Sequence, residues 1–320
     1  YRGYEILGSP VPCGGTTQRQ ILTILENFDL SNLMHNSPEH LHLFIESARH
    51  AFADRYRFLG DPDFGPVPLD GILSTKYASE IAGLVDRQNA TMERERTRQP
   101  WITFADTDLH NPWAHDPLQQ PDKPQTSSPP SANDCTTHFS VIDKDRNMVS
   151  CTQTAVNGFG SRVVIPGTGI LLTNGMVVFN PKQGSPNSIA GYKRGLNNMA
   201  PALILRNGSP FLSLGAPGGR RIISRLAQVL VNVIDFGQGI QEAITSPTVD
   251  AAERETLVDK RIENVTIEKL EEMGHNIRVV PEETSVISGF SKPRGVMVNP
   301  KTNRIHAGVQ PTGTDDAHGY

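Results

Sequence analysis

The sequence has little of what defines several functional classes. Its 320 residues include only three cysteines, Cys13, Cys135 and Cys151, which are too few for a disulfide framework and lack metal-ligand spacing. The ten histidines are scattered without an HExxH motif, so we expect no metal site and no cofactor. No run of about eighteen apolar residues occurs, so no segment is expected to span a bilayer. A net charge of −4 provides no basic surface for nucleic acid.

The overall amino-acid composition is that of a globular protein. With 37% apolar and 20% charged residues, the chain is long enough to bury a sizeable core in one or two domains. It begins with Tyr1 and carries no signal-type segment, which we interpret as a fragment or a processed product. The compartment is therefore left open.

Helical spacing of apolar residues predicts three helices in the first third of the chain, at residues 17–27, 37–59 and 74–87. Ser37 or Pro38 starts the second helix, and Ser74 is the N-cap of the third. The most regular apolar pattern, residues 218–237, predicts a long helix stopped by Gly237. A shorter helix at residues 266–275 ends at Gly274.

Alternation of apolar and polar residues predicts strands in the second half of the chain, at 137–143, 147–154 and 295–308. The same pattern predicts a hairpin at 201–215 that turns at Asn207-Gly208. Hairpins with helices laid on them indicate an α/β fold of stacked layers. Between the two halves, residues 111–134 hold six prolines and almost no large apolar residues. We expect this segment to be a mobile, exposed linker, and we place the main boundary of the chain here.

The stretch "DCTTHFSVIDKDRNMVSCTQT" raises a chemical possibility, because threonines stand where the linker meets the first strand. If the Cys135–Thr136 bond is cut, Thr136 carries a hydroxyl and a free α-amine with a reference pKa of about 7.7–8.0. One residue then supplies both nucleophile and base. Gly218 and Gly219 precede the long helix and offer backbone N–H groups to an oxyanion. Taken singly, each feature also has a structural explanation, as a strand residue or a turn.

Four longer motifs show a resemblance: "TTHFSVIDKDRNMVSCTQT", "NGFGSRVVIPGTGILLTNGMVVF", "YKRGLNNMAPALI" and "LGAPGGRRIISRLAQVLVNVIDFG". Their order resembles the small subunit of the γ-glutamyltransferase family, whose members are N-terminal nucleophile hydrolases cut autocatalytically from one precursor. Residues 1–135 resemble the C-terminal part of its large subunit, and residues 136–320 its small, catalytic subunit. The resemblance implies an αββα sandwich, two subunits from one precursor, and a missing N-terminal half.

Position by position, the resemblance also implies roles for the site residues. Thr136 matches the nucleophile that becomes a new N-terminus, so cleavage is expected between Cys135 and Thr136. Thr154 matches the second threonine, whose hydroxyl contacts the nucleophile. Gly218 and Gly219 match the glycine pair of the oxyanion hole.

The positions that recognise a γ-glutamyl group in the family differ here. Val156 stands where glutathione-cleaving members have Asn or Glu, and Val178 replaces the acid that holds the α-amino group, although Asn174 remains. The serines that bind the α-carboxylate appear as Asn197 and Asn198, whose amides can still donate to a carboxylate. The chain thus resembles the acylase and amidohydrolase branches, and we expect a small amide substrate whose acyl group lacks an α-amine.

Arg220 is an added cation beside the glycine pair, either a solvated surface residue or a contact for an acidic substrate. Three hypotheses follow. The first is an autoprocessed N-terminal threonine hydrolase or acyltransferase acting on a small amide. The second is a true γ-glutamyltransferase or glutathione hydrolase. The third is a non-catalytic, truncated paralogue that serves as a scaffold or binding module.

Overall fold

The computed structural model describes residues 1–91, 109–120, 135–253, 255–282, 289–313 and 315–319. Its α-helices are α1 (Gly15–Leu25), α2 (Pro38–Phe58), α3 (Leu69–Ile72), α4 (Thr75–Leu84), α6 (Arg221–Ile234), α7 (Ile240–Thr245) and α8 (Asn264–Glu272). Short 3₁₀ turns are η1 (Pro62–Phe64), η2 (Pro112–His115) and η3 (Gly175–Val178). The strands are β1 (Tyr4–Gly8), β2 (Thr136–Ile142), β3 (Met148–Thr154), β4 (Ala202–Arg206), β5 (Ser209–Gly215), β6 (Val249–Asp250), β7 (Thr256–Asp259), β8 (Ile277–Val280), β9 (Arg294–Val298) and β10 (Ile305–Val309).

The predicted helix starts are confirmed by their capping bonds. The Ser37 side chain accepts a hydrogen bond from the His40 N–H at the start of α2, and Ser74 accepts one from the Tyr77 N–H at the start of α4. Each bond satisfies one of the four backbone donors that a helix N-terminus leaves unpaired. Both helices therefore begin at the capping serines that the local sequence predicts.

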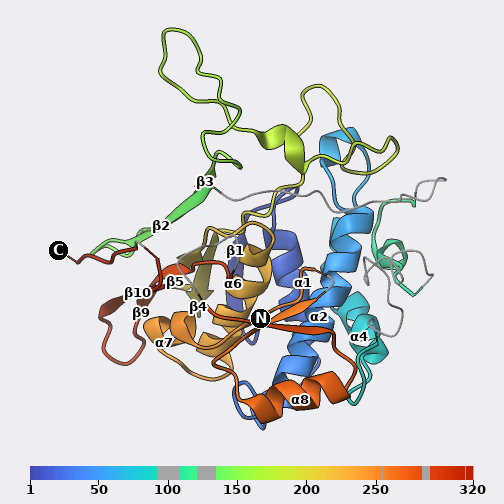
Figure 1. Ribbon diagram of the computed structural model, residues 1–320, viewed down its shortest axis with the longest axis vertical. Helices are drawn as coiled ribbons and strands as arrows, with labels where there is room; N and C mark the ends of the chain where they lie inside the picture. Colours follow the sequence, from blue (N-terminus) through green and yellow to red (C-terminus); the bar gives the residue numbers. More distant parts are fainter. Residues whose placement is uncertain (92–108, 121–134, 254, 283–288, 314, 320) are drawn as a thin grey trace.

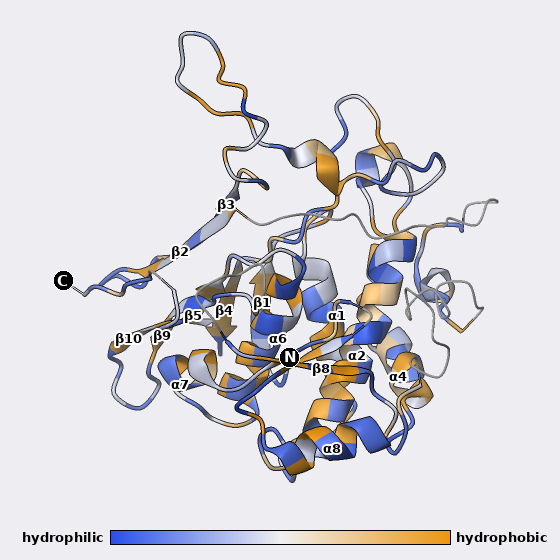
Figure 2. Cartoon of the chain, viewed as in Figure 1, coloured by the Kyte–Doolittle hydropathy of each residue, from blue (hydrophilic) through white to orange (hydrophobic). Residues whose placement is uncertain are grey.

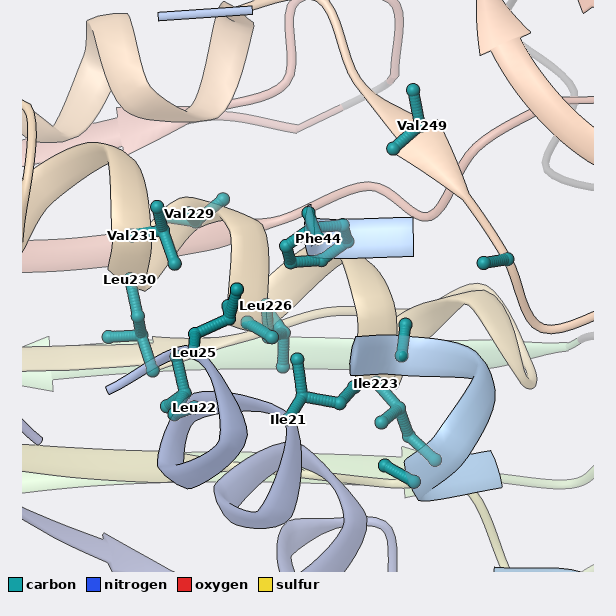
Figure 3. Close-up of a cluster of buried hydrophobic side chains, with 14 of the residues drawn as sticks. Ile21, Leu22, Leu25, Phe44, Ile223, Leu226, Val229, Leu230, Val231 and Val249 are labelled. Carbon is teal, nitrogen blue, oxygen red and sulfur yellow. The ribbon is translucent and has the colours of Figure 1, made fainter. Parts of the chain in front are cut away.

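Five antiparallel strands form the main sheet in the order β1-β4-β5-β9-β10. The predicted hairpin β4–β5 turns at Asn207 (φ 51°) and Gly208 (φ 73°), both in the left-handed region that a two-residue turn requires. Helices α1 and α6 pack against each other beside this sheet (Figure 1). Figure 3 shows how apolar side chains from α1 and α6 interdigitate with Phe44 of α2 and with Val249.

Alternation along β5 separates the two faces of this sheet. Leu212 and Leu214 join the helical core, whereas the Ser213 hydroxyl donates to the Val149 carbonyl of β3 at 2.6 Å on the other face. The hairpin β2–β3 accordingly packs on the face opposite the helices, with β2 against β5 and β9 and β3 against β4 and β5. This arrangement confirms the α/β fold and places helix, sheet and second sheet in successive layers.

In the described residues, the outer face of the β2–β3 hairpin lacks the second helical layer of a four-layer αββα sandwich. Phe139, Val141 and Val149 lie on that face with 47%, 46% and 47% of their surface exposed. No helix of the described ranges packs on it. A further exposed apolar segment, residues 157–177, projects from the body above β3 (Figure 2).

The remaining small sheet, β6-β7-β8, pairs β7 with β8 in parallel through the connecting helix α8, which packs on α2. A parallel pair needs such a crossover because its two strands run in the same direction. This unit extends the core that α1, α2 and α6 share. Both predicted subunit segments, 1–135 and 136–320, therefore contribute to one hydrophobic core.

The prediction of an exposed linker beginning at residue 111 is wrong for its first part. Trp113, 8% exposed, packs in a cluster with Phe58 and Leu196, and Asp116 accepts a hydrogen bond from the Gly71 N–H at 2.9 Å. One tryptophan provides enough apolar surface to fasten the short turn η2 to the body. Residues 121–134 of the predicted linker lie outside the described residues.

Candidate active site

The two predicted threonines face each other across the β2–β3 hairpin. The strand register pairs Thr136 with Thr154, and their Oγ1 atoms lie 3.0 Å apart. Thr154 Oγ1 also lies 3.3 Å from the Cys135 carbonyl oxygen, to which it donates, and 2.9 Å from the Val156 N–H, from which it accepts. Because a hydroxyl has one proton, the remaining contact must be a donation from Thr136 to Thr154.

The Cys135 carbonyl, on the peptide bond predicted to be cut, has a second donor. The Ala155 N–H donates to this oxygen at 3.3 Å, beside the Thr154 hydroxyl. Two donors on one carbonyl oxygen are the arrangement that stabilises a developing oxyanion. Cys135 is exposed and Thr136 is partly buried, so the bond lies at the surface edge of the hairpin.

Val156 holds an unusual backbone conformation directly after this pair. Its φ is 71°, in the left-handed region that β-branched residues rarely adopt, and its side chain is buried. The conformation brings its N–H onto the Thr154 hydroxyl. Backbone strain of this kind persists where surrounding structure over-determines it, often at functional sites.

On β2, His138 fills the space between the two sheets. Its Nδ1 lies 2.8 Å from Thr152 Oγ1 and its Nε2 lies 2.9 Å from Ser140 Oγ. Burial, together with the nearby Arg294 guanidinium, lowers the pKa of His138 to about 4, so the ring is neutral at pH 7. A Cβ added at Gly215 of β5 would lie 2.2 Å from this ring, which shows how closely β5 approaches β2.

The two predicted oxyanion glycines follow β5 in the loop that leads to α6. The Pro217 carbonyl accepts hydrogen bonds from Ser291 Oγ at 2.7 Å and from the Lys292 N–H at 3.1 Å. In a trans peptide the N–H points opposite to the C=O, so the Gly218 N–H is directed away from Ser291. Among the described residues, the N–H groups of Gly218 and Gly219 donate to no protein acceptor, and both remain free for a ligand.

The backbone favours glycine at both positions of this loop, most strongly at Gly218. Gly218 has φ 133° and Gly219 has φ 56°, conformations that favour glycine. A Cβ at Gly218 would also lie 2.5 Å from Ser291 Cα, closer than non-bonded carbon atoms come. The close approach of Ser291 is a feature that sequence reasoning missed, since it joins residues 73 positions apart without a local signal.

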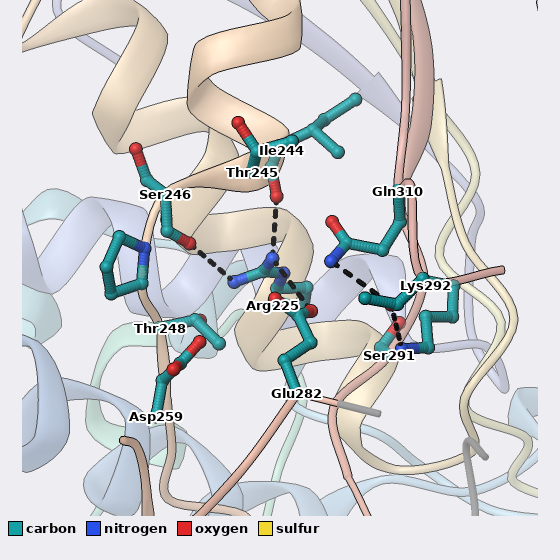
Figure 4. A network of polar contacts seen from close by, with 12 residues as sticks. Arg225, Ile244, Thr245, Ser246, Thr248, Asp259, Glu282, Ser291, Lys292 and Gln310 are labelled. Atoms are coloured by element: carbon teal, nitrogen blue, oxygen red, sulfur yellow. Dashed lines mark hydrogen bonds and ion pairs between the residues drawn. The ribbon is translucent and has the colours of Figure 1, made fainter. Parts of the chain in front are cut away.

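Figure 4 shows a polar network around Arg225 of α6, drawn together with Ser291 and Lys292. Arg225 of α6 donates to the Ile244 carbonyl at 2.6 Å and lies 3.5 Å from the Glu282 carboxylate. The same carboxylate is bound by Arg261 at 2.5 Å. Glu282, whose side chain is only 3% exposed, is thus paired with two guanidinium groups, as a buried carboxylate requires.

Arg220 is not the solvated surface arginine that one sequence interpretation suggested. Its side chain is only 21% exposed, and its Nη2 lies 3.5 Å from a carboxylate oxygen of Glu253. Arg221 shares the same carboxylate at 3.7 Å. Both guanidinium groups therefore share the Glu253 carboxylate beside the glycine loop.

Asn174 is placed beside the threonine pair, and its backbone N–H donates to the Ala155 carbonyl at 3.0 Å. Asn197 and Asn198 lie elsewhere, against the N-terminal segment and α2. In the part of the chain that is described, neither forms a hydrogen bond with Thr136 or Thr154. Their surroundings involve Arg55, a residue that the sequence patterns did not single out.

The described ranges contain neither a cluster of metal-binding side chains nor a helix that could span a membrane. No group of three or more His, Cys, Asp or Glu side chains there could hold a metal ion. No helix within those ranges combines the length and apolar character needed to cross a bilayer. The three cysteines form no disulfide.

Comparison with known proteins adds an independent observation. The model of the family described as gamma-glutamyltranspeptidase matches residues 1–320. The chain is 31% identical over 329 aligned positions to the glutathione hydrolase proenzyme of Escherichia coli K12, covering 99% of this chain and 51% of that protein. It is 34% identical to the acylase ACY 1 proenzyme of Pseudomonas sp. SE83, covering 87% of this chain and 44% of that protein.

Solved structures show the same fold. A cephalosporin acylase from Bacillus halodurans superposes with a TM-score of 0.77 at 24% identity, over 98% of this chain and 50% of that one. A gamma-glutamyltranspeptidase chain from Pseudomonas nitroreducens, complexed with L-DON, matches with a TM-score of 0.50 at 30% identity. That match covers 57% of this chain and 99% of the other. The chain thus spans about half the length of the curated relatives that it matches.

Proposed function

Because the chain belongs to the γ-glutamyltranspeptidase family, whose members are hydrolases and transferases, we propose that it is part of an autoprocessed N-terminal threonine amidohydrolase or acyltransferase. Processing separates residues 1–135 from residues 136–320, the large-subunit and small-subunit segments. The observation that carries this proposal is the continuous chain of donors from Thr136 through Thr154 to the Cys135 carbonyl.

The proposed cleavage uses that chain of hydroxyls. Thr136 Oγ1 attacks the Cys135 carbonyl carbon and passes its proton to Thr154, which passes its own proton to the carbonyl oxygen. The Ala155 N–H stabilises the tetrahedral intermediate. On collapse the proton on the former carbonyl oxygen moves to the nitrogen, the C–N bond breaks, and an ester on Thr136 Oγ1 and a free α-amine are left. Water then hydrolyses the ester and releases a carboxylate at Cys135.

After cleavage, the α-amine of Thr136 is the base for the second reaction. An amine with a pKa near 8 takes the proton of its own hydroxyl as that oxygen attacks the substrate amide. The acyl group is transferred to Thr136 and the amine product leaves. The free N–H groups of Gly218 and Gly219 stabilise the oxyanion of both the acylation and the deacylation step. Water or an amine then accepts the acyl group.

The proposed substrate is a small amide whose acyl group lacks an α-amine. Val156 and Val178 are both 8% exposed and occupy the positions whose polar counterparts recognise that amine in glutathione-cleaving members. A buried ammonium beside them would stay unpaired, at a cost of several kcal/mol. The similarity to the acylase ACY 1 proenzyme supports a substrate of this class. Activity toward a γ-glutamyl group is the second candidate, supported by the glutathione hydrolase relatives.

Intact-mass measurement of the purified chain tests the processing step, with a Thr136→Ala variant alongside. We expect the wild type to resolve into a fragment ending at Cys135 and one beginning at Thr136. The variant is expected to remain a single 35.0 kDa chain. If the wild type also remains whole, the donor chain is insufficient for cleavage, and the scaffold hypothesis becomes the better account of this polypeptide.

A substrate pair tests acyl recognition. Hydrolysis of glutaryl p-nitroanilide, which lacks the α-amine, is compared with that of γ-glutamyl p-nitroanilide under the same conditions. We expect a higher kcat/KM for the glutaryl compound, since no acid is left to pair the ammonium. Strict dependence on the α-amine would instead establish γ-glutamyl transfer as the function.

A further inference from the structure

A cavity opens at the end of the two stacked sheets that lies away from the threonine pair. Three hairpin turns meet there: residues 143–147 between β2 and β3, Asn207-Gly208 between β4 and β5, and residues 299–304 between β9 and β10. Strand β5 runs from this end toward the glycine loop, and its length separates the two by about 20 Å. The cavity is therefore distinct from the candidate active site.

The cavity combines an apolar surface with positive charge. Its volume of about 620 Å³ suits a small organic molecule. The apolar part of the lining comes from Pro210, Phe211, Val298 and Pro300, of which Phe211 and Val298 are buried. Two cations, Arg146 and Arg206, also line it, and no Asp or Glu of the described residues does. A ligand that matches this lining has an apolar body and a negative charge.

Arg146 is held at the cavity by its backbone and by the neighbouring turn. Its φ is 68°, in the left-handed region where a long side chain is uncommon and which often marks functional sites. Its Nη2 donates to the Asn303 carbonyl at 2.7 Å and to Asn303 Oδ1 at 3.1 Å. The nearby Asp143 carboxylate is bound instead to Asn147, at 2.8 Å through each oxygen. The Arg146 guanidinium is thus positioned, and no carboxylate of the described chain forms an ion pair with it.

Arg206 is positioned by aromatic rings. Its Cζ lies 5.7 Å from the centroid of the Tyr4 ring, to which the β1–β4 register brings it, and that ring lies 5.2 Å from the Phe211 ring. This contact orients the guanidinium without neutralising its charge. Within the described ranges, Arg206 has no ion-pair partner either. Two guanidinium groups from different sheets therefore line one cavity without a counter-ion from the protein.

We propose that this cavity is a second ligand site, which binds a small carboxylate with an aromatic or branched apolar body. Arg146 and Arg206 bind the carboxylate, because the planar fork of a guanidinium matches the two oxygens of that group. The apolar body packs against Phe211 and Val298 and loses contact with water. Binding here needs neither Thr136 nor the glycine loop, so the proposal stands independently of the proposed function.

Fluorescence anisotropy of dansylglycine tests the proposal, with the neutral dansylglycinamide as the matched probe. Each probe is titrated with the purified chain at low ionic strength, where screening of the charges is weakest. We expect dansylglycine to bind about fivefold more tightly than the amide, as two partly solvated ion pairs allow. Arg146→Gln and Arg206→Gln are each expected to reduce this preference, and the double variant to remove it. Arg304→Gln is the matched control, because it removes one charge from the same β9–β10 turn without lining the cavity.

Filling the cavity provides a second test that does not depend on charge. Ser209 lies exposed in the lining at the start of β5, so Ser209→Trp is expected to weaken binding of both probes. Thermal melting confirms that each variant is folded. Equal binding of the two probes to the wild type, or no binding of dansylglycine, would overturn the proposal. A preference that survives the double variant would place the probe elsewhere on the chain, and an equal loss in Arg304→Gln would show attraction to surface charge alone; either result would also overturn it.

Discussion

Replacement of Thr154 by valine isolates the hydroxyl that connects the nucleophile to the peptide bond it is proposed to cut. Valine has the same shape and branching and keeps the strand propensity of β3. The substitution removes three hydrogen bonds at once: those that Thr154 accepts from Thr136 and from the Val156 N–H, and the one that it donates to the Cys135 carbonyl. Thr154→Ser keeps the hydroxyl and serves as the conservative counterpart.

The expected magnitude follows from the role of the hydroxyl at the Cys135 carbonyl. Removing one oxyanion donor costs about 2.7–4 kcal/mol of transition-state stabilisation, a rate loss of about 10²–10³-fold. The folded state loses up to about 1 kcal/mol for each of the three hydrogen bonds, a total that partial solvation of the hairpin edge reduces. Thermal melting therefore has to show that the variant is folded before a slower rate of processing is attributed to the lost hydroxyl.

The assay is a time course of intact mass after purification, with thermal melting measured on the same samples. Thr152→Val is the matched control, because its hydroxyl bonds His138 at 2.8 Å and does not touch Thr136. We expect Thr152→Val and Thr154→Ser to be processed at rates near the wild type. Processing of Thr154→Val within tenfold of the wild type, or equal slowing by Thr152→Val, would refute the relay.

Three further outcomes are expected. Gly218→Ala, which forces a Cβ to within 2.5 Å of Ser291, should reduce turnover at least 10²-fold, whereas Gly208→Ala, with open space around it, should leave kcat unchanged. The folded pKa of His138, about 4, is below the ordinary 6.5, so the unfolded chain takes up the proton first and stability falls as pH drops from 6.5 toward 4. Each pH unit in this range is worth about 1.4 kcal/mol. In urea titrations, the free energy of unfolding of the wild type relative to that of His138→Asn should therefore fall by about 3 kcal/mol between pH 6.5 and pH 4. Val156→Asn places a residue that tolerates φ 71° at a strained position, so the free energy of unfolding of this variant should not fall. Its rate of γ-glutamyl anilide hydrolysis should rise relative to its rate with glutaryl anilide.

The elements that sequence reasoning predicted correctly are those whose signals are local. The helices α1, α2, α4 and α6 and the hairpin at Asn207-Gly208 form where apolar spacing, capping serines and turn residues agree within a few positions. The exposed linker was mispredicted from residue 111 because proline content outweighed a single tryptophan, whose burial depends on Phe58 and Leu196 far away in the chain.

The sequence by itself determined the fold class and the family, because long contiguous motifs and local periodicity carry that information. Tertiary structure alone decided what surrounds each candidate residue. It pairs Arg220 with Glu253, packs Ser291 closely against Gly218, and gives Asn197 and Asn198 different hydrogen-bond partners. These contacts join residues from separate layers, and no pattern within either segment records the partner. Whether a polar side chain is free or already bound is a property of the packed core, not of the local sequence.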